Sequence, residues 1–334
     1  MTGRPVLLSR QNYSDLMEYR TLGNSGLLVS VVGLGCNNFG GRLDAAQTLA
    51  VVDAALDAGV TLFDTADTYG AGGGSETLLG QALKGRREEV VLATKFGHQG
   101  VDLGYGPAAG AKGGRAYIRR AVEESLRRLQ TDHIDLYQLH TPDPRTPIAE
   151  TLAALSELVR EGKVRYIGHS NFAGWQIAEA AHVAREIGAV PFVSAQNEWS
   201  LLERGAEREV VPAALHYGLG VLPFFPLANG LLTGKVRRAT GVPAGTRLAS
   251  RPERVTEVGL DAVERLAAWG EAHGRSVLEI GVGALAARPG CGSVIAGASS
   301  AEQVRANAGA GQWVPTSEEL AEIDAVLDAE PAAA

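Results

Sequence analysis

Four polar residues have the side chains that the reduction of a carbonyl group requires: Asp64, Tyr69, Lys95 and His140. Hydride addition to a carbonyl carbon leaves an alkoxide, and a tyrosine hydroxyl can donate the proton that this oxygen needs. Because an unperturbed tyrosine has a pKa near ~10, we expect the Lys95 ammonium to lower the pKa of Tyr69. The shift is roughly 3 units for charges ~4 Å apart at an effective dielectric constant of ~20. Asp64 would hold the lysine, and His140 would stabilise charge on the carbonyl oxygen.

Each of these residues also has a purely structural interpretation. Asp64 can be a turn acid, Lys95 its ion-pair partner, His140 a histidine at a strand end, and Tyr69 an aromatic residue of a loop. Their joint occurrence favours the chemical interpretation over four separate structural ones. A different reaction class uses one of them alone, since a barrel lysine such as Lys95 can form a Schiff base in a class I aldolase.

The elements that must position these residues alternate along the chain. Val-, Ile- and Leu-rich runs, typical of parallel strands buried on both faces, occur at 31–35, 60–65, 90–96, 133–140, 163–170, 192–198, 219–225 and 292–297. Amphipathic helical patterns lie between them. Eight such units predict a (β/α)8 barrel, with an open doubly wound sheet as the alternative. In a barrel the carboxyl ends of neighbouring strands would bring Asp64, Lys95 and His140 into one pocket.

Capping and periodicity signals mark the helices, and a turn marks a hairpin. The helix signals are Asp44 with Gln47 before a face of Leu49, Val52 and Leu56, the repeat Ile118, Val122, Leu126 and Leu129, Thr146-Pro147, and Thr316 with Glu319 opening a C-terminal helix. The segment 19–30 predicts a β-hairpin that turns at Asn24-Ser25-Gly26. No linker or repeat divides the chain. We therefore predict an N-terminal extension over 1–18 and a single domain over 19–328.

Composition excludes several classes of function. The 334 residues contain 31 Lys+Arg and 38 Asp+Glu, a net charge of −7, which argues against a nucleic-acid partner. With 45% hydrophobic and 21% charged residues, the chain predicts a folded globule. Two cysteines are too few for a disulfide framework or a structural zinc site, and no metal is expected. No apolar stretch indicates a signal peptide or membrane span, so we predict a cytoplasmic protein with no membrane partner.

A hydride must come from a cofactor, and the sequence offers polar groups to hold one. The glycine pattern at 33–38 lacks the third glycine of a dinucleotide-binding turn, and the run 71–76 lacks the ending of a phosphate loop. Ser170, Asn171 and Gln196 suit a carboxamide, although they can equally hydrogen-bond strand ends, and Phe224 offers a stacking face. The Gly-, Lys- and Arg-rich excursion 226–254 suits a flap over an anionic ligand.

Several motifs occur together in order: FDTADTYGAGGGSETLLGQAL, ATKFG, DHIDLYQLHTPDP, IGHSNF, AQNEWS, PLANGLLTGK and IAGASSAEQVRAN. From about residue 19 to 328 the chain resembles the aldo-keto reductases, and within them the bacterial reductases that also resemble potassium-channel β subunits. The resemblance implies a (β/α)8 barrel with an N-terminal hairpin closing its bottom and an extra C-terminal helix. It also implies NADPH, bound extended without a Rossmann fold.

The same resemblance implies roles for individual residues. Asp64, Tyr69, Lys95 and His140 match the catalytic tetrad, with Tyr69 as proton donor. The cofactor-binding positions it implies are Cys36, Asn37, Ser170, Asn171, Gln196, Phe224, Leu227, Ala228, Asn229, Lys235, Arg247, Gly297, Ser299, Gln303 and Asn307, with Arg247 and Ser299 expected at a 2′-phosphate. The sequence departs from the family at Phe225, where Ser is frequent, at Ala306, where Glu is common, and at Phe224, where Tyr or Trp is usual. NADH is therefore kept as a possible cofactor beside NADPH.

We therefore predict an NADPH-dependent oxidoreductase that reduces the carbonyl groups of aldehydes and ketones to alcohols. The alternatives are an NADP(H)-binding redox-sensing subunit with little turnover and a sugar dehydrogenase working in the oxidative direction. Phe39, Phe96 and Trp199, with Tyr105 and the loop 97–114, are expected to line the outer substrate pocket, although such aromatic residues also serve as packing.

Overall fold

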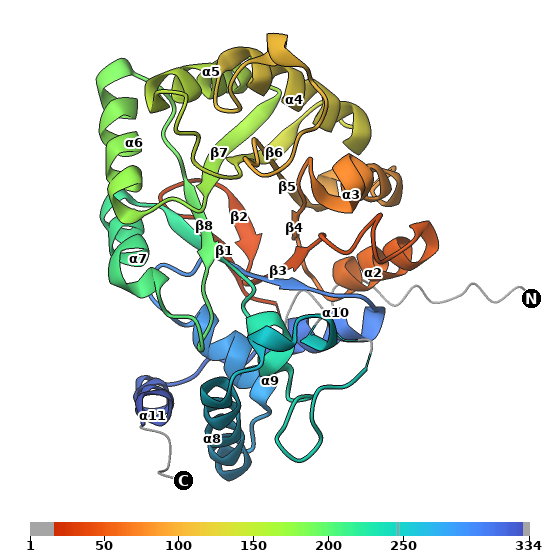
Figure 1. Cartoon of the computed structure of the whole chain (residues 1–334), viewed down its shortest axis with the longest axis vertical. Helices are drawn as coiled ribbons and strands as arrows, with labels where there is room; N and C mark the ends of the chain where they lie inside the picture. The colour runs from red at the N-terminus through yellow and green to blue at the C-terminus, as the bar shows by residue number, and fades with distance from the viewer. Residues whose placement is uncertain (1–16, 245, 247, 330–334) are drawn as a thin grey trace, which may run out of the picture.

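The computed structural model describes residues 17–244, 246 and 248–329, in which eight parallel strands form a nearly closed barrel (Figure 1). The strands are β3 (Val32–Gly35), β4 (Leu62–Asp64), β5 (Val91–Phe96), β6 (Ile134–Leu139), β7 (Val164–Ser170), β8 (Ser194–Glu198), β9 (Gly220–Phe224) and β10 (Val294–Gly297). They follow the order β10-β3-β4-β5-β6-β7-β8-β9, and an isolated bridge from Val221 to Cys291 spans the remaining gap. The predicted (β/α)8 barrel is confirmed, and the doubly wound alternative is wrong.

The strands form because their apolar residues are buried on both faces, inside the barrel and against the helices. Every residue of β4 and β6 is buried. One core cluster, which includes Leu62, Leu136 and Leu222, lies inside the barrel beside the N-terminal hairpin. A larger cluster fills the layer between strands and helices.

The helices surround the barrel (Figure 1). They are α2 (Ala45–Asp57), α3 (Tyr69–Ala82), α4 (Arg115–Leu129), α5 (Ile148–Arg160), α6 (Gly174–Ile187), α7 (Ala206–Tyr217), α8 (Glu257–His273), α9 (Val277–Glu279), α10 (Ala301–Ala310) and α11 (Ser317–Asp328). A π-helical turn (Ile280–Ala284) follows α9, and short 3₁₀ turns lie at Arg87–Glu89, Pro107–Ala109, Ala228–Thr233, Leu248–Ser250 and Pro252–Arg254.

Most predicted helix signals are confirmed. Capping boxes join Asp44 to Gln47 and Thr316 to Glu319, and the predicted apolar face of α4 is buried. Two details were wrong. Leu49 of α2 is 44% exposed, because the buried face of that helix runs through Thr48, Val51 and Val52 instead. Pro147, not Thr146, occupies the N-cap position of α5, and the Thr146 hydroxyl donates to Asp143.

The predicted hairpin consists of β1 (Tyr19–Thr21) and β2 (Leu28–Ser30), paired antiparallel with Tyr19 opposite Ser30. It closes the barrel at the amino ends of the strands, where the backbone N–H of Asn24 donates to the carbonyl of Gly218. Its Leu22 side chain is fully buried in the inner cluster. The chemistry must therefore be reached from the opposite, carboxyl end.

Of the predicted N-terminal extension, residues 1–16 lie outside the described part of the chain. Within the described residues, no helix combines the length and the apolar composition that a membrane crossing requires. The same residues contain no cluster of three or more His, Cys, Asp or Glu side chains arranged to hold a metal ion.

Candidate active site

The four predicted catalytic residues meet at the carboxyl end of the barrel. Asp64 ends β4, Lys95 lies near the end of β5, His140 follows β6, and Tyr69 begins α3. The Lys95 ammonium donates to Asp64 Oδ2 at 2.5 Å, to the Thr65 carbonyl at 3.0 Å and to the Tyr69 hydroxyl at 3.4 Å. The ring of His140 stands edge-on to that of Tyr69, with centroids 5.8 Å apart.

A glycine turn presents Tyr69 to this cluster. The chain directly after Tyr69 is left-handed, with φ of 66° at Gly70 and 60° at Ala71. A Cβ at residue 70 would lie 2.6 Å from the Phe39 carbonyl oxygen, so only glycine fits this close approach. The run 71–76 thus turns the chain at the start of α3 rather than forming part of the cavity wall.

Asp64 is held on both of its carboxylate oxygens. While Oδ2 accepts from Lys95, Oδ1 accepts from the side-chain amides of Gln138 at 3.1 Å and Gln196 at 2.9 Å. Lys95 is 1% exposed. Burial by itself lowers the pKa of Lys95, but the charge of Asp64 and the hydrogen bonds to Asp64 and Tyr69 outweigh burial and raise it. The lysine is therefore a fixed ammonium, which is the wrong protonation state for Schiff-base formation and disfavours an aldolase.

Burial has the largest effect on the pKa of the Tyr69 hydroxyl. Burial raises the pKa of Tyr69 above its ordinary value, and the opposing effect of the Lys95 ammonium is smaller. The expected lowering of this pKa is therefore wrong in direction, because burial outweighs the effect of the ammonium, and the Asp64 carboxylate 2.5 Å from Lys95 adds to the rise. At neutral pH the phenol is therefore protonated.

His140 is neutral as well. Burial, followed by the charges of Lys95 and His98, lowers the pKa of His140 to about 2. Its Nδ1 atom is buried and has no hydrogen-bond partner within the described residues. A neutral imidazole beside the Tyr69 hydroxyl can donate an N–H to an oxygen without carrying charge into the site.

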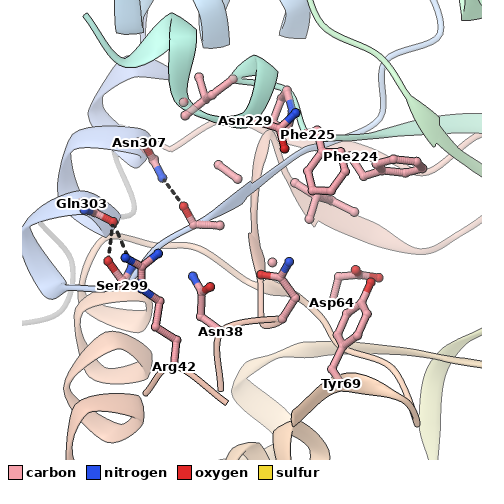
Figure 2. A pocket seen from close by; sticks show the side chains of 18 of the residues that line it. Asn38, Arg42, Asp64, Tyr69, Phe224, Phe225, Asn229, Ser299, Gln303 and Asn307 are labelled. Carbon is pink, nitrogen blue, oxygen red and sulfur yellow. Dashed lines mark hydrogen bonds between the residues drawn. The ribbon is translucent and has the colours of Figure 1, made fainter. Parts of the chain in front are cut away.

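Asp64, Tyr69 and His140 line the inner end of a cavity of about 660 Å³, whose wall Lys95 itself does not reach (Figure 2). Most predicted cofactor residues line it: Asn37, Ser170, Asn171, Gln196, Phe224, Leu227, Asn229, Lys235, Gly297, Ser299, Gln303 and Asn307. Cys36 and Ala228 are described but do not line the cavity, and Cys36 is fully buried behind it. Arg247 lies outside the described residues.

The polar residues at the strand ends combine the two roles that the sequence left open. The Ser170 hydroxyl donates to the Gln196 carbonyl at 2.8 Å, and the Asn171 amide donates to the His140 carbonyl at 3.0 Å. These bonds fix the ends of neighbouring strands. The same side chains also line the cavity, so they are rigidly held in its wall.

The far end of the cavity is also polar. Gln303 Oε1 accepts from the backbone N–H of Ser299 at 2.9 Å and from the Ser299 hydroxyl at 3.1 Å. The side-chain amide of Asn307 donates to the Gly297 carbonyl at 3.5 Å. Arg42, which the sequence reasoning missed, extends from the segment between β3 and α2 toward Ser299 and Gln303 (Figure 2). The only signal for it was an arginine shortly after the first barrel strand.

The three predicted substrate-pocket aromatics do not lie on the cavity wall. Phe39 and Phe96 are fully buried, and Trp199 is 1% exposed. Phe96 stacks on Tyr137, with centroids 4.6 Å apart, and the Trp199 indole donates to Glu207. This prediction is corrected to the packing alternative. Tyr105, half-buried, packs against the ring of Tyr117 instead.

Two other residues of the loop after β5 do line the cavity: His98 and Val101. The ring of His98 lies edge-on to that of His140, with centroids 4.7 Å apart. The sequence reasoning had named the loop 97–114 as a whole but not these side chains. A histidine two residues beyond a strand end was the available signal.

Comparison with known proteins agrees with this geometry. Residues 31–328 match the model of the aldo/keto reductase family. An uncharacterized oxidoreductase of Bacillus subtilis, YrpG, is 43% identical over 296 residues, covering 86% of this chain and 89% of the relative. A probable voltage-gated potassium channel subunit beta of rice (Oryza sativa subsp. japonica) is 34% identical, covering 94% and 98% of the two chains.

A further relative is the aldo-keto reductase YhdN of Bacillus subtilis, 35% identical over 323 residues, which covers 93% of this chain and 94% of the relative. The similarity thus extends over almost the whole barrel and includes the strand ends that carry the polar cluster. With its eight-stranded barrel, N-terminal hairpin and family match, this oxidoreductase chain belongs to the aldo/keto reductase family.

Proposed function

We propose that the protein is an NADPH-dependent reductase of small aldehydes and ketones and that Tyr69 is its proton donor. The observation that carries the proposal is the Tyr69 hydroxyl, 3.4 Å from the Lys95 ammonium at the inner end of a 660 Å³ cavity. A donor phenol, a fixed ammonium and a neutral imidazole converge there. These groups suit a reaction in which negative charge develops on one oxygen.

The residues along the cavity suit a nicotinamide dinucleotide. Asn171 and Gln196 offer amide groups near the polar cluster, and Phe224 offers an aromatic face for stacking. Asn229 Oδ1 is buried and has no hydrogen-bond partner within the described residues, so it can accept a bond from a ligand. Arg42 and Lys235 bring cationic side chains to the wall, as a ligand with several phosphates requires. Arg42, beside Ser299, favours NADPH over NADH because a 2′-phosphate adds negative charge at that end.

The mechanism follows from the protonation states. The chemistry supplied by a bound reduced nicotinamide is a hydride for the carbonyl carbon. His140 and the Tyr69 hydroxyl orient the carbonyl oxygen, and Tyr69 donates its proton to that oxygen as charge develops there. The Lys95 ammonium then stabilises the tyrosinate that remains, while Asp64 keeps the lysine in place. The proton is restored to Tyr69 from solvent through the cavity.

A second candidate function is a regulatory subunit that binds NADP(H) and turns over slowly. The similarity to a probable potassium channel subunit beta supports this second candidate. The two candidates share the cofactor and differ in the rate of the chemical step. A sugar dehydrogenase working in the oxidative direction needs the tyrosinate as base, and the raised pKa of Tyr69 disfavours that direction at neutral pH.

The test measures NADPH oxidation with a panel of aldehydes, ketones and sugars, with NADH in parallel, for the wild type and Tyr69→Phe. The variant should lose about 10²- to 10⁴-fold in kcat, because it removes the proton donor. Its Kd for NADPH should stay within about twofold of wild type, because uniform binding contacts are unchanged.

Tyr217→Phe is the matched control, since it removes the same hydroxyl from a tyrosine that bonds His182 on the outer surface. It should keep full turnover. Full turnover in Tyr69→Phe would refute the proposal. Tight NADPH binding by wild type with no turnover on the panel would establish the regulatory candidate instead.

A further inference from the structure

The loop 97–114, which follows β5, forms part of the cavity wall. His98 and Val101 of this loop line the cavity. The ring of His98 lies edge-on to that of His140, at a centroid distance of 4.7 Å and an interplanar angle of 85°. This part of the wall is therefore at the inner end of the cavity, near Tyr69, and a carbonyl compound that reaches Tyr69 lies beside it.

The sequence of the loop does not fix its shape. Five glycines occur between 97 and 110. Two of them, Gly104 and Gly106, have left-handed φ angles of 73° and 75°, and a Cβ at either position would meet no atom within 4 Å. Because glycine has more conformational freedom than any other residue, contacts outside these positions must hold the loop in place.

Three main-chain carbonyls of the loop converge on one side chain, that of the half-buried Lys112. The Lys112 ammonium donates to the carbonyls of His98 at 2.5 Å and Gln99 at 3.2 Å, and also to that of Val101. An ammonium has three N–H donors, which matches these three acceptors. The main chain of both wall residues is thus bound directly by Lys112, while the backbone N–H of Gln99 donates to the Thr141 hydroxyl at 3.0 Å.

The backbone beside Lys112 is held by the next unit of the barrel. The backbone N–H of Gly113 donates to Asp143 Oδ2 at 2.7 Å, and the Gly113 carbonyl accepts from the Thr151 hydroxyl at 2.8 Å. Thr151 belongs to α5, and Asp143 lies between β6 and α5. The lysine side chain therefore extends from a fixed point on the barrel back to the glycine-rich loop.

We propose that Lys112 is a positioning residue that holds the loop after β5 as a fixed part of the substrate-binding wall. The proposal rests on the proposed reductase function. With Lys112 in place the loop is ordered before the substrate arrives. Without it, substrate binding must order the loop, and this loss of conformational freedom lowers the affinity for the carbonyl compound. Because the wall residue His98 lies beside His140, the effect falls on the substrate and not on NADPH.

The test compares wild type with Lys112→Met, which removes the charge and the donors, and with Lys112→Arg, which keeps a cation with several N–H donors. Lys84→Met is the matched control, since Lys84 is exposed and its side chain has no hydrogen bond or ion pair to another described residue. For each protein we measure kcat and KM for an aldehyde with saturating NADPH, the Kd for NADPH, and the thermal midpoint. Hydrogen exchange by mass spectrometry reports on the backbone amides of 98–111 without requiring turnover.

For Lys112→Met we expect KM to rise about 5- to 30-fold, because three charge-assisted hydrogen bonds to the loop are lost. Its kcat should stay within about threefold and its Kd for NADPH within about twofold of wild type, because the polar cluster and the rest of the cavity are unchanged. The loop amides should exchange at least about fivefold faster. Lys112→Arg should keep KM within about threefold of wild type, and Lys84→Met should match wild type in every measurement.

Two kinetic results would overturn the proposal. One is an unchanged KM in Lys112→Met. The other is a rise in KM that is matched by an equal rise in the Kd for NADPH and a lower thermal midpoint, which would make Lys112 a residue of general stability. If the wild type reduces no carbonyl compound, the proposed function fails and the role in substrate binding fails with it. Hydrogen exchange separates the two failures, since unchanged exchange of the loop amides in Lys112→Met would refute the anchoring of the loop by Lys112 in either case.

Discussion

At the scale of single residues, burial and pairing decide the protonation states of the polar cluster. Tyr69 sits beside an ammonium, yet burial has the larger effect on its pKa and raises it. Lys95 stays charged because Asp64 outweighs its desolvation, and His140 stays neutral because nothing offsets burial. The arrangement stores one proton on the phenol and holds it there at neutral pH.

A pH profile in both directions tests this. A raised pKa means that the protonated phenol is present at all pH values below it and is lost only as pH rises through it. Reduction uses the protonated form, so its kcat should be flat from about pH 6 to about pH 9. Oxidation needs the tyrosinate, so its kcat should rise by up to about tenfold per pH unit over the same range.

Initial rates at saturating substrate and cofactor measure both profiles. The pKa of His140, about 2, places its own titration below the range measured. A reduction rate that falls steadily between about pH 7 and about pH 9 would mean that the charge of Lys95, not burial, has the larger effect on the pKa of Tyr69.

The sequence predicted the four residues of the cluster because the ends of neighbouring parallel strands must meet. It did not predict the direction of the Tyr69 pKa shift, since spacing identifies neighbours but does not measure burial. The sequence does contain the signal that places Phe96 outside the barrel. Successive strand residues point to opposite faces, so with Lys95 inside the barrel, Phe96 has to point outward to the helices. His98 had no periodic pattern to indicate its direction.

At the scale of elements, a buried ion pair joins α3 and α4 behind the cluster. Glu76 on α3 is fully buried, accepts from the Arg128 guanidinium at 2.6 Å and accepts from the Thr94 hydroxyl on β5 at 2.6 Å. The two bonds of Glu76 hold α3 against β5. Tyr69, at the start of α3, is thereby held next to Lys95 on β5.

Arg128→Met should lower the free energy of unfolding by about 3–5 kcal/mol, because it leaves the Glu76 carboxylate buried without its cation. Arg127→Met is the matched control on the same helix. Its side chain is 69% exposed and pairs with Glu124 at the surface, so the loss should stay below about 1 kcal/mol. Denaturant unfolding measures both, and equal losses would show that the buried pair does not stabilise the packing of α3 on α4.

Element boundaries were predicted where a cap is written in local sequence, as at Asp44 and Thr316. One was missed by a residue at α5, where Thr146 donates its hydroxyl to Asp143 and the N-cap position is Pro147. Leu49 was misassigned because three apolar residues at helical spacing define a stripe only approximately, and smaller residues of α2 form the buried face.

At the scale of the whole molecule, the two ends of the barrel have separate tasks. The hairpin closes the amino end with Leu22, while the polar cluster and cavity occupy the carboxyl end. We therefore expect residues at the closed end to support stability and residues at the open end to support the proposed chemistry.

Leu22→Ala should lower the free energy of unfolding by about 2–5 kcal/mol, because it opens a cavity in the inner core. Leu28→Ala in the same hairpin is the control, since Leu28 is 53% exposed and its loss should cost less than about 0.5 kcal/mol. Neither variant should change kcat at a temperature where it is folded. A kcat that falls in Leu22→Ala alone would show that the two ends are coupled.

The single barrel followed from counting strands, helices and strand-end residues along the chain. The shape of the cavity did not follow, because the excursion 226–254 and the loop after β5 have no repeating pattern. Within the excursion, Leu227, Asn229 and Lys235 line the cavity, whereas Ala228 does not. Which side chains of this segment face the cavity depends on backbone angles, for example the φ of 59° at Asn229. Residue types alone do not specify these angles.

The most direct measurement of the central claim uses reduced cofactor that carries deuterium at the reactive C4 position of the nicotinamide. Wild type and Tyr69→Phe are each mixed with this cofactor and an aldehyde in a single turnover, and the alcohol is analysed by mass spectrometry. We predict that the wild type forms an alcohol with one deuterium on the former carbonyl carbon and that Tyr69→Phe forms almost none in the same time. Deuterated alcohol formed at an undiminished rate by Tyr69→Phe would contradict the assignment of Tyr69 as proton donor.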